Sequence, residues 1–434
     1  MPTLTRAAAL ALLILLAAPP VRADTPATAL AGLTVRSVDI EGALMTEDEV
    51  ILEQISTRIG DRLDPEQLDR DRRALLSLGA FSEVQVTTRR VEDGVAVRFR
   101  VVEAGTYRLS PSLMINAEGG ISLGGTLTTA NAEGTLVRGS VGVLFGGVTQ
   151  TNIEVKAPRV RGLYGQHELI YFNRQRENTV LDFFEVANEV FATFAPRLGE
   201  HTRVGLMAGY QRMRADKPDR TLSDDHVDDV NTLGLLVGID TAGPPVIGRR
   251  GWWGEARLEA TGLLGGQAEF WRGQLDLRRY QAVARRHILA LTSLTTLTSG
   301  TVGEEIAPWQ TYHLGGTNTV RGWDVGSRSG KNQAIGTVEW RWIVRPADPL
   351  RLPFGLHLSP GLELAAFADA GLAWSGKADT RFDRIIGGYG LGLRVAGPGI
   401  GRLRCDLAMG EGSPTLRFYL GSGDKAVAQR RRVR

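Results

Sequence analysis

Cysteine is almost absent from this sequence of 434 residues, in which Cys405 is the single example. One cysteine cannot form an internal disulfide, so a disulfide framework is excluded. Histidine is also scarce, and none of the six stands at metal-ligand spacing from a second histidine or from the cysteine. The sequence therefore predicts no metal site and no bound cofactor.

The motifs of common catalytic sites are missing as well. No Gly-x-Ser-x-Gly nucleophile elbow occurs. Gly330-Lys331 is no phosphate loop, because residue 325 is not glycine and no serine or threonine follows the lysine. Gly388, Gly390 and Gly392 alternate within a strand pattern and do not connect a strand to a helix. We therefore expect that the protein is not an enzyme.

The sequence has no strong excess of one charge, and after residue 23 it has no long hydrophobic run. The formal net charge of +3 is small for this length and gives no reason to expect a nucleic-acid partner. After residue 23, no stretch reaches the roughly eighteen consecutive apolar residues that a membrane helix needs. If the mature chain resides in a membrane, it must cross as a closed barrel of strands, since only that alternative satisfies every backbone hydrogen bond in lipid.

Residues 1–23 have the pattern of a cleaved export signal. Arg6 supplies a positive start, and an apolar run over 7–18 follows it. Pro19 and Pro20 end this run, and small residues stand at the expected cleavage position. The run is too short to span a bilayer, so we expect a signal peptide and not an anchor.

Residues 33–104 have the pattern of one small α+β domain. Thr46, with Glu49 three residues later, predicts a capping box that begins a helix. Asp93-Gly94 predicts the tight turn of a hairpin. The expected elements, in order, are a strand over 34–40, helices over 46–55 and from Asp64-Pro65, and strands over 81–90 and 95–102.

This order of elements resembles a POTRA (polypeptide-transport-associated) domain. The resemblance includes Gly79-Ala80-Phe81, the preceding Leu63-Asp64 and the segment 99–103 in matching places. It implies a periplasmic domain that binds unfolded or extended client polypeptides by adding them to an open sheet edge. The alternative is another small α+β domain with the same order of elements.

From Tyr107 to residue 421 the helical period disappears and segments alternate in polarity. The segments 135–144, 202–210 and 286–294 are examples, each bounded by turn residues. We count sixteen such segments, which predicts a mainly β fold: a transmembrane antiparallel β-barrel of about 16 strands over 107–421. The alternative is a large soluble β-sandwich. Residues 424–434 form a basic tail to which we assign no function. Six aromatic residues are candidates for the interfacial girdles, namely Trp252, Trp253, Trp271, Trp340, Trp342 and Tyr389.

One motif within the barrel region identifies a family. Residues 312–323 contain Gly315, Gly316, Val320, Arg321, Gly322 and Trp323. This pattern resembles the Gly-Gly and Val-Arg-Gly-aromatic motif of the BamA/TamA outer-membrane assembly and translocation superfamily, with tryptophan in place of phenylalanine or tyrosine. The resemblance implies a loop between strands eleven and twelve that folds back into the lumen, where its arginine pairs with acids of the wall.

The acids can be sought from the strand pattern. A buried arginine requires paired carboxylates, because an unpaired buried charge is costly. Val338, Trp340 and Trp342 suit lipid, so Glu339 between them points to the lumen. Asp369 is expected at the end of the following strand. We therefore predict a lumen cluster of Arg321, Glu339 and Asp369.

The resemblance covers nearly the whole mature chain and implies a bacterial outer-membrane factor, with a single POTRA domain, that inserts or translocates polypeptides. Its partners would be client chains, outer-membrane lipids and periplasmic or lipoprotein accessory factors. Clients would pair at a seam between the first strand, 107–116, and the last, 415–420. The alternatives are a dedicated two-partner-type secretion pore and a passive outer-membrane channel. The pore is disfavoured because such pores usually carry two POTRA units and a plug helix, whereas only about ten residues separate the expected signal from the first strand, too few for a plug helix.

Overall fold

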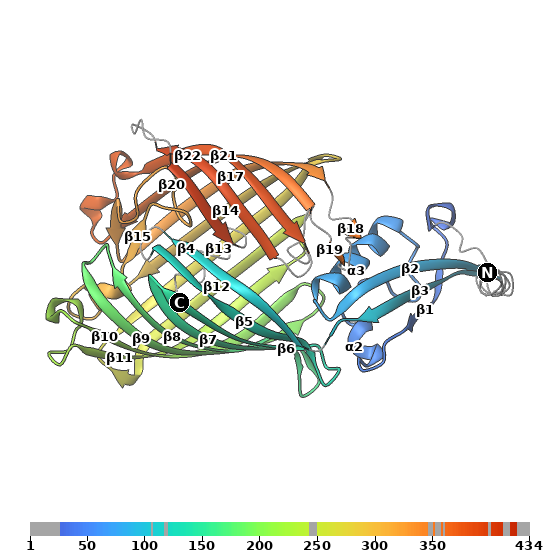
Figure 1. The fold of residues 1–434 in the computed structure, drawn as a ribbon, viewed down its shortest axis with the longest axis horizontal. Coiled ribbons are helices and arrows are strands. Elements are labelled where there is room, and N and C mark those ends of the chain that lie inside the picture. Colours follow the sequence, from blue (N-terminus) through green and yellow to red (C-terminus); the bar gives the residue numbers. More distant parts are fainter. Residues whose placement is uncertain are drawn as a thin grey trace, which may run out of the picture.

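A computed structural model describes residues 27–105, 107–116, 120–242, 250–345, 350–351, 357–358, 361–397, 401–410 and 417–422. The expected signal peptide, 1–23, and the basic tail, 424–434, lie outside these residues. The described chain forms a small α+β domain followed by a large sheet that curves into a barrel (Figure 1). No helix in the described ranges is both long and apolar enough to cross a membrane.

The α+β domain has the predicted order of strand, helix, helix, strand, strand. Its elements are η1 (Ala27–Leu30), β1 (Val35–Glu41), α2 (Asp48–Leu52), α3 (Pro65–Ser77), β2 (Phe81–Val91) and β3 (Gly94–Glu103). The sheet order is β1-β3-β2, with β1 parallel and β2 antiparallel to β3. Asp64 caps α3 by accepting the Glu66 N–H at 2.9 Å, and Pro65 occupies the first helical position, as predicted.

The predicted capping role of Thr46 is wrong. Helix α2 begins at Asp48, and its N-cap residue Glu47 makes no side-chain capping bond. The Thr46 hydroxyl instead donates to Glu103 at 2.6 Å and accepts from the Asn131 amide at 2.7 Å. In a cap the hydroxyl oxygen would accept a helix N–H, but here it accepts from the Asn131 amide while its proton is bound by a carboxylate, which explains the difference. Burial raises the pKa of Glu103, but the hydrogen bonds from Thr46 and the neighbouring backbone outweigh it and lower that pKa overall.

The barrel sheet contains sixteen strands in the described part of the chain, the number that the sequence predicts. They are β4 (Tyr107–Asn116), β5 (Gly120–Ala132), β6 (Val137–Gly146), β7 (Val148–Val160), β8 (Leu163–Asn178), β9 (Phe183–Leu198), β10 (Thr202–Ala215), β11 (Val227–Asp240), β12 (Gly251–Gly266), β13 (Phe270–Ala284), β14 (His287–Thr298), β17 (Asn332–Arg345), β20 (Gly361–Trp374), β21 (Ile386–Gly397), β22 (Gly401–Gly410) and β23 (Arg417–Ser422). Neighbours pair antiparallel in chain order, so β4 and β23 are the two ends of the sheet.

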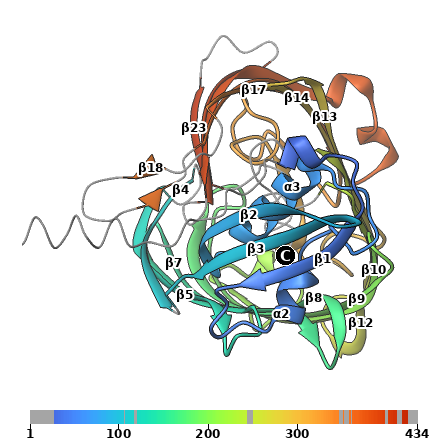
Figure 2. The same cartoon turned by 90° about the vertical axis from the view of Figure 1, so that its right-hand side faces the viewer.

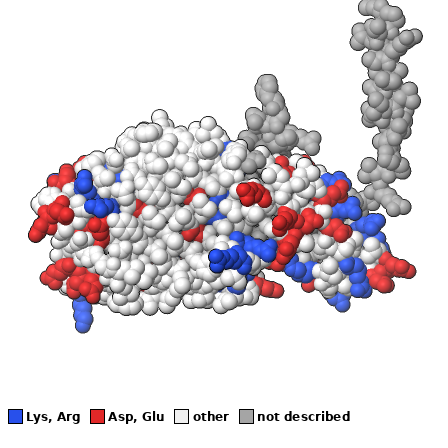
Figure 3. Space-filling model, turned by 90° about the horizontal axis from the view of Figure 1, so that it is seen from below, with Lys and Arg blue, Asp and Glu red and all other residues white. Residues whose placement is uncertain are grey.

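The outer wall of the barrel is apolar, and the inner wall carries charge. Along β17, Val338, Trp340 and Trp342 are exposed on the outside, whereas Glu339 is buried. Figure 3 shows that charged side chains gather mainly towards the two ends of the molecule, while the middle of the visible barrel wall is largely free of them. This distribution matches a wall that meets lipid outside and a polar lumen inside.

Five of the six girdle candidates are exposed on the barrel surface, but Trp253 is not. Its exposed fraction is 7%, and its ring lies 4.3 Å from the Arg278 guanidinium and 5.7 Å from that of Arg203. Trp252 and Trp253 are consecutive in β12, and consecutive strand residues point to opposite faces. Trp253 therefore belongs to the lumen, where its ring stacks with arginines.

The α+β domain lies across one end of the barrel, as the two ribbon views show (Figures 1 and 2). Leu136, in the turn between β5 and β6, is buried in the hydrophobic core of this domain. A Cβ added to Gly134 of the same turn would lie 1.8 Å from the Met45 carbonyl oxygen. Arg138 at the start of β6 donates to the Leu78 carbonyl. The turn between β5 and β6 thus joins the barrel to the α+β domain through both hydrophobic packing and hydrogen bonds. We call this contact the joint.

Candidate functional site in the barrel lumen

The connection between β14 and β17 carries the predicted motif. It folds back as a hairpin in which β15 (Tyr312–Leu314) pairs with β16 (Arg328–Gly330). We call residues 315–327, which lie between these strands, the loop tip. Gly315, Gly316 and Gly322 in the tip have φ of +115°, +80° and +93°, a backbone region that side chains other than glycine rarely adopt. These glycines therefore let the tip turn sharply.

Arg321 lies at the centre of the site and is completely buried. Its Nε and Nη2 donate to the two carboxylate oxygens of Asp369, at 2.8 and 3.0 Å, and its backbone N–H donates to the same carboxylate at 3.1 Å. Thr337 donates to Asp369 at 2.8 Å, and the Phe367 ring lies 3.2 Å from the guanidinium carbon. The bidentate geometry fixes both the position and the orientation of the arginine.

Further acids and arginines extend this pair into a network. Arg321 Nη1 donates to Asp406 on β22 at 3.0 Å and lies 3.5 Å from the Glu339 carboxylate on β17. Arg394 on β21 bridges the same two acids, with Nη2 2.8 Å from Glu339 and Nη1 bonded to Asp406. Arg341 Nε donates to Glu339 at 2.7 Å. The network thus joins the loop to four consecutive strands, β17, β20, β21 and β22.

Charge pairing explains how so many ionised groups can lie out of water. Arg404 lies 3.7 Å from Asp406 and donates to Asn318 of the loop tip at 3.2 Å. Each of the three acids contacts at least one arginine, so none is an isolated buried charge. Such a network holds elements in place, and breaking one partner is far more costly than the net worth of the pair. The contacts of this network therefore hold the loop tip in position against the barrel wall.

The backbone of the tip lies directly against the barrel wall because the wall has glycine there. A Cβ added to Gly388 of β21 would be 1.8 Å from the Arg321 carbonyl oxygen. One added to Gly410 of β22 would be 2.7 Å from the Gly322 carbonyl oxygen. The absence of a side chain at both wall positions is therefore a requirement of loop docking.

The hydrophobic residues of the motif complete the docking. Val320 is fully buried with Leu314, Ile335 and neighbouring residues of the wall. Trp323 packs against the same cluster, and its indole Nε1 donates to the Gly387 carbonyl at 2.7 Å. The tip is thus held by apolar contact on both sides of the buried arginine.

A residue of the last strand also contacts the loop tip. Arg417 of β23 donates to the Gly322 carbonyl at 2.8 Å. Its Nη2 and Nε also reach both carboxylate oxygens of Asp324, at 2.9 and 3.1 Å. The loop tip therefore contacts and supports β23, the strand at one end of the barrel sheet.

The structure brings Arg321, Glu339 and Asp369 into one cluster and places the loop between the eleventh and twelfth barrel strands. Asp369 lies within β20 and not at its end. Sequence reasoning missed Asp406 and Arg417. Asp406 alternates with Arg404 in β22, which is the lumen-facing period and was an available signal. No pattern in the sequence marked Arg417 as a partner of the loop tip, because an arginine in such a segment can have many roles.

Replacing Gly322 with alanine is expected to lower the thermal unfolding midpoint of the barrel. The new Cβ would lie 2.3 Å from the Met409 backbone carbon, in addition to the strain of a positive φ, which alone costs about 1 kcal/mol. Gel mobility of the folded barrel after heating measures the midpoint. Gly303→Ala in the same loop is the control, because φ there is +90° but nothing lies within 4 Å. Equal shifts for both variants would contradict the role of close contact with β22.

Comparison with known proteins agrees with this geometry. The family model described as the Omp85 superfamily domain matches residues 150–425, and that described as POTRA, surface antigen variable number repeat, matches residues 33–104. The outer membrane protein assembly factor BamA of Nitratidesulfovibrio vulgaris (strain Hildenborough) is 31% identical over 72 residues. That match covers 17% of this chain and 9% of the relative, so the similarity in sequence concerns a small part of that protein.

Solved structures share the fold at low sequence identity. BamA from Haemophilus ducreyi lacking POTRA domains 1–3 has a TM-score of 0.56 at 15% identity, with 90% of this chain and 83% of that chain covered. CdiB from Escherichia coli has a TM-score of 0.55 at 13% identity, with 89% and 76% covered. At these identities the likeness concerns the fold alone. Since the first family model matches more than half of the sequence, the chain belongs to the Omp85 superfamily, as an outer-membrane β-barrel with one matched POTRA domain on the periplasmic side.

Proposed function

We propose that this protein inserts polypeptides into the outer membrane or translocates them across it, without bond chemistry. The observation that carries the proposal is the junction between β4 and β23. These strands touch, but among the described residues no ladder of paired residues joins them. An unpaired strand edge in lipid lacks partners for its backbone groups, so an incoming strand that supplies them is strongly favoured.

Among the described residues, the ladder that holds β23 to the barrel wall is short, which favours movement of this strand. Within the described ranges, strand β23 pairs with β22 through six residue pairs, from Leu403↔Ser422 to Ala408↔Arg417. By comparison, β8 and β9 pair through fourteen. Separation of β4 from β23 leaves this ladder intact, and bending β23 away from β22 would break only its few hydrogen bonds. The contact of Arg417 with the loop tip gives β23 a second support that does not depend on β4.

The POTRA domain offers a second edge to clients. In the sheet order β1-β3-β2, the outer edges belong to β1 and β2. An extended polypeptide can add to such an edge through main-chain hydrogen bonds, which requires little sequence specificity. The partners that follow from this proposal are unfolded or extended client chains, outer-membrane lipids, and periplasmic or lipoprotein accessory factors.

Depletion of the protein from its host tests the proposal. The outer-membrane and secreted proteomes are compared with and without it. A broad loss of β-barrels is expected for an assembly factor, and loss of one or two secreted or surface proteins for a dedicated pore of two-partner type. No change in either proteome would overturn the proposal and favour a passive channel.

In the depleted host, a plasmid-borne copy of the protein should restore the lost outer-membrane or secreted proteins. A reversible disulfide between β4 and β23 is expected to abolish this rescue. A panel of cysteine pairs places one residue in β4 and one in β23, in a Cys405→Ser background that leaves no other thiol. The oxidised pair would keep the barrel folded but prevent a client strand from entering, and a reductant would restore rescue. Matched pairs across β8 and β9 are the control. Full rescue by an oxidised seam would show that β4 and β23 need not separate.

A further inference from the structure

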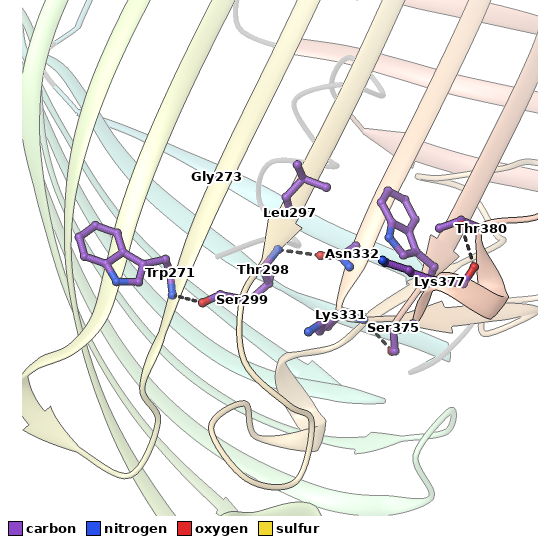
Figure 4. A pocket seen from close by; sticks show the side chains of 12 residues that line it. Trp271, Gly273, Leu297, Thr298, Ser299, Lys331, Asn332, Ser375, Lys377 and Thr380 are labelled. Atoms are coloured by element: carbon purple, nitrogen blue, oxygen red, sulfur yellow. Dashed lines mark hydrogen bonds between the residues drawn. The ribbon is translucent and has the colours of Figure 1, made fainter.

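A pocket of about 510 Å³ that is lined in part by two lysines lies on the outer wall of the barrel, at the strand ends away from the POTRA domain. Figure 4 shows the side chains that line this lysine pocket. Its floor is formed by side chains at the ends of β13, β14, β17 and β20, and the connection after β20 closes one side. Trp271 and Leu297 belong to the outward-facing series of their strands and are each 54% exposed. The pocket therefore opens towards lipid and not towards the lumen.

The lining supplies positive charge and hydrogen-bond donors without a carboxylate. Lys331 and Lys377 are both among the lining residues. Lys331 Nζ donates to the Gly300 carbonyl, and Lys377 forms no ion pair within the part of the chain that is described. Ser299 and Ser375 use their hydroxyl oxygens to accept backbone N–H groups, at 2.8 and 3.2 Å, which leaves each hydroxyl proton able to donate to a ligand.

The nearest acid of the same connection is already engaged. Asp379 accepts the backbone N–H groups of Ser375 and Gly376, both at 3.3 Å, and lies 3.8 Å from Arg384. These contacts engage its carboxylate within the connection itself. The pocket as a whole is therefore suited to an anion, and phosphate oxygens are common partners of lysine and hydroxyl donors.

An apolar hollow adjoins the lysine pocket and shares Trp271 with it. The hollow has a volume of about 510 Å³ and runs across β9 to β13. Phe194, Leu206, Leu235 and Leu258 line it and are exposed on the lipid-facing wall. A hydrocarbon chain fits such a surface, and the tryptophan marks the boundary at which interfacial aromatic residues lie.

We propose that the pocket and the hollow together bind one phosphate-bearing lipid of the outer leaflet, with its headgroup between Lys331 and Lys377 and an acyl chain along the hollow. Basic residues at a membrane surface attract anionic lipid headgroups, and an adjoining apolar surface adds the burial of a chain. This site lies on the wall formed by β9 to β20, apart from the β4–β23 junction, so it is independent of the proposed client path.

Retention of bis-phosphorylated lipid A by the purified full-length protein tests the site. Native mass spectrometry of the barrel released from detergent micelles counts the bound lipid. The double variant Lys331→Gln/Lys377→Gln is expected to lower binding by about tenfold, from the loss of two charges near the headgroup. Lys217→Gln is the matched control, because this lysine lies in a loop at the same end of the barrel but pairs with Asp182 at 2.6 Å.

A second variant fills the pocket without changing charge. Gly273 has nothing within 4 Å of an added Cβ, so Gly273→Phe occupies the space without a backbone clash and should abolish retention. Gly336→Phe is its control, since Gly336 is equally open but lines neither cavity. Unchanged binding by both pocket variants, or equal binding of lipid A without its phosphates, would overturn the proposal. Displacement of lipid A by equimolar inorganic phosphate would show a site for free anions and would also overturn it.

Discussion

Replacing Arg321 with alanine is expected to destabilise the barrel by about 3–5 kcal/mol, the cost of removing one partner from a buried ion network. The loss falls mainly on Asp369, which keeps the hydrogen bond from Thr337 at 2.8 Å but loses both bonds from the guanidinium. Asp406 keeps Arg394, and Glu339 keeps both Arg394 and Arg341. Urea unfolding of the folded barrel in detergent, followed by gel mobility, measures the change.

A double-mutant cycle separates the pair from the rest of the network. Arg321→Ala and Asp369→Ala together should cost clearly less than the sum of the two single changes, because the second removes the carboxylate that the first leaves unpaired. The same cycle with Asp406→Ala should show weaker coupling, since Arg394 still neutralises Asp406 in the Arg321 variant. Additive effects in the first cycle would remove the Arg321–Asp369 pair as the centre of the site.

Two further variants test whether charge alone is sufficient. Arg321→Lys keeps the positive charge but cannot reproduce the two parallel bonds to Asp369, so it should recover only part of the lost stability. Arg328→Ala is the control for a loop arginine. Its Nε donates to the Arg384 carbonyl at 3.2 Å, and it pairs with no carboxylate in the described chain. A loss for Arg328→Ala as large as that for Arg321→Ala would indicate a general effect on the loop.

The sequence contained enough to find part of this cluster. Glu339 stands between aromatic and aliphatic residues at period two, so only one side of the strand could be the lumen. Because a buried arginine needs paired carboxylates, Arg321 then required acids nearby. Asp406 was missed because alternation gives the face of a residue but not its height in the barrel. Height depends on strand register, and register places Asp369 opposite Gly388 and Gly388 opposite Gly410.

Other differences arose where tertiary contacts override a local signal. Thr46 has the local pattern of a helix cap, but its hydroxyl joins Glu103 and the barrel residue Asn131. No local pattern could show this, because Asn131 is 85 residues away in the chain. Trp253 has the residue type of a membrane girdle, but it follows Trp252, which holds the outward position in β12, so strand alternation turns Trp253 inward. A partner distant in the chain thus decides the position of Thr46, whereas strand alternation decides that of Trp253.

Replacing Leu136 with aspartate is expected to detach the POTRA domain from the barrel. Truncation of a buried leucine alone costs about 2–5 kcal/mol, and a charge placed in the same apolar core adds a desolvation penalty. The remaining joint would consist of polar contacts such as Asn131–Thr46, which exchange readily with water. Hydrogen exchange of the full-length protein in nanodiscs should therefore increase at the residues around Met45 and Leu78, which face the joint.

Leu198→Asp controls for a new charge at the same end of the barrel. This residue ends β9 and is 60% exposed, so its replacement should leave exchange in the POTRA domain unchanged. Exchange in the barrel strands should be unaltered in both variants, because the joint contributes no pair to the barrel ladders. If Leu136→Asp left the Met45 and Leu78 segments as protected as before, the polar contacts alone would be sufficient to hold the domain. The domain would then be fixed by Arg138 and Asn131, and the burial of Leu136 would be a consequence of docking and not its cause.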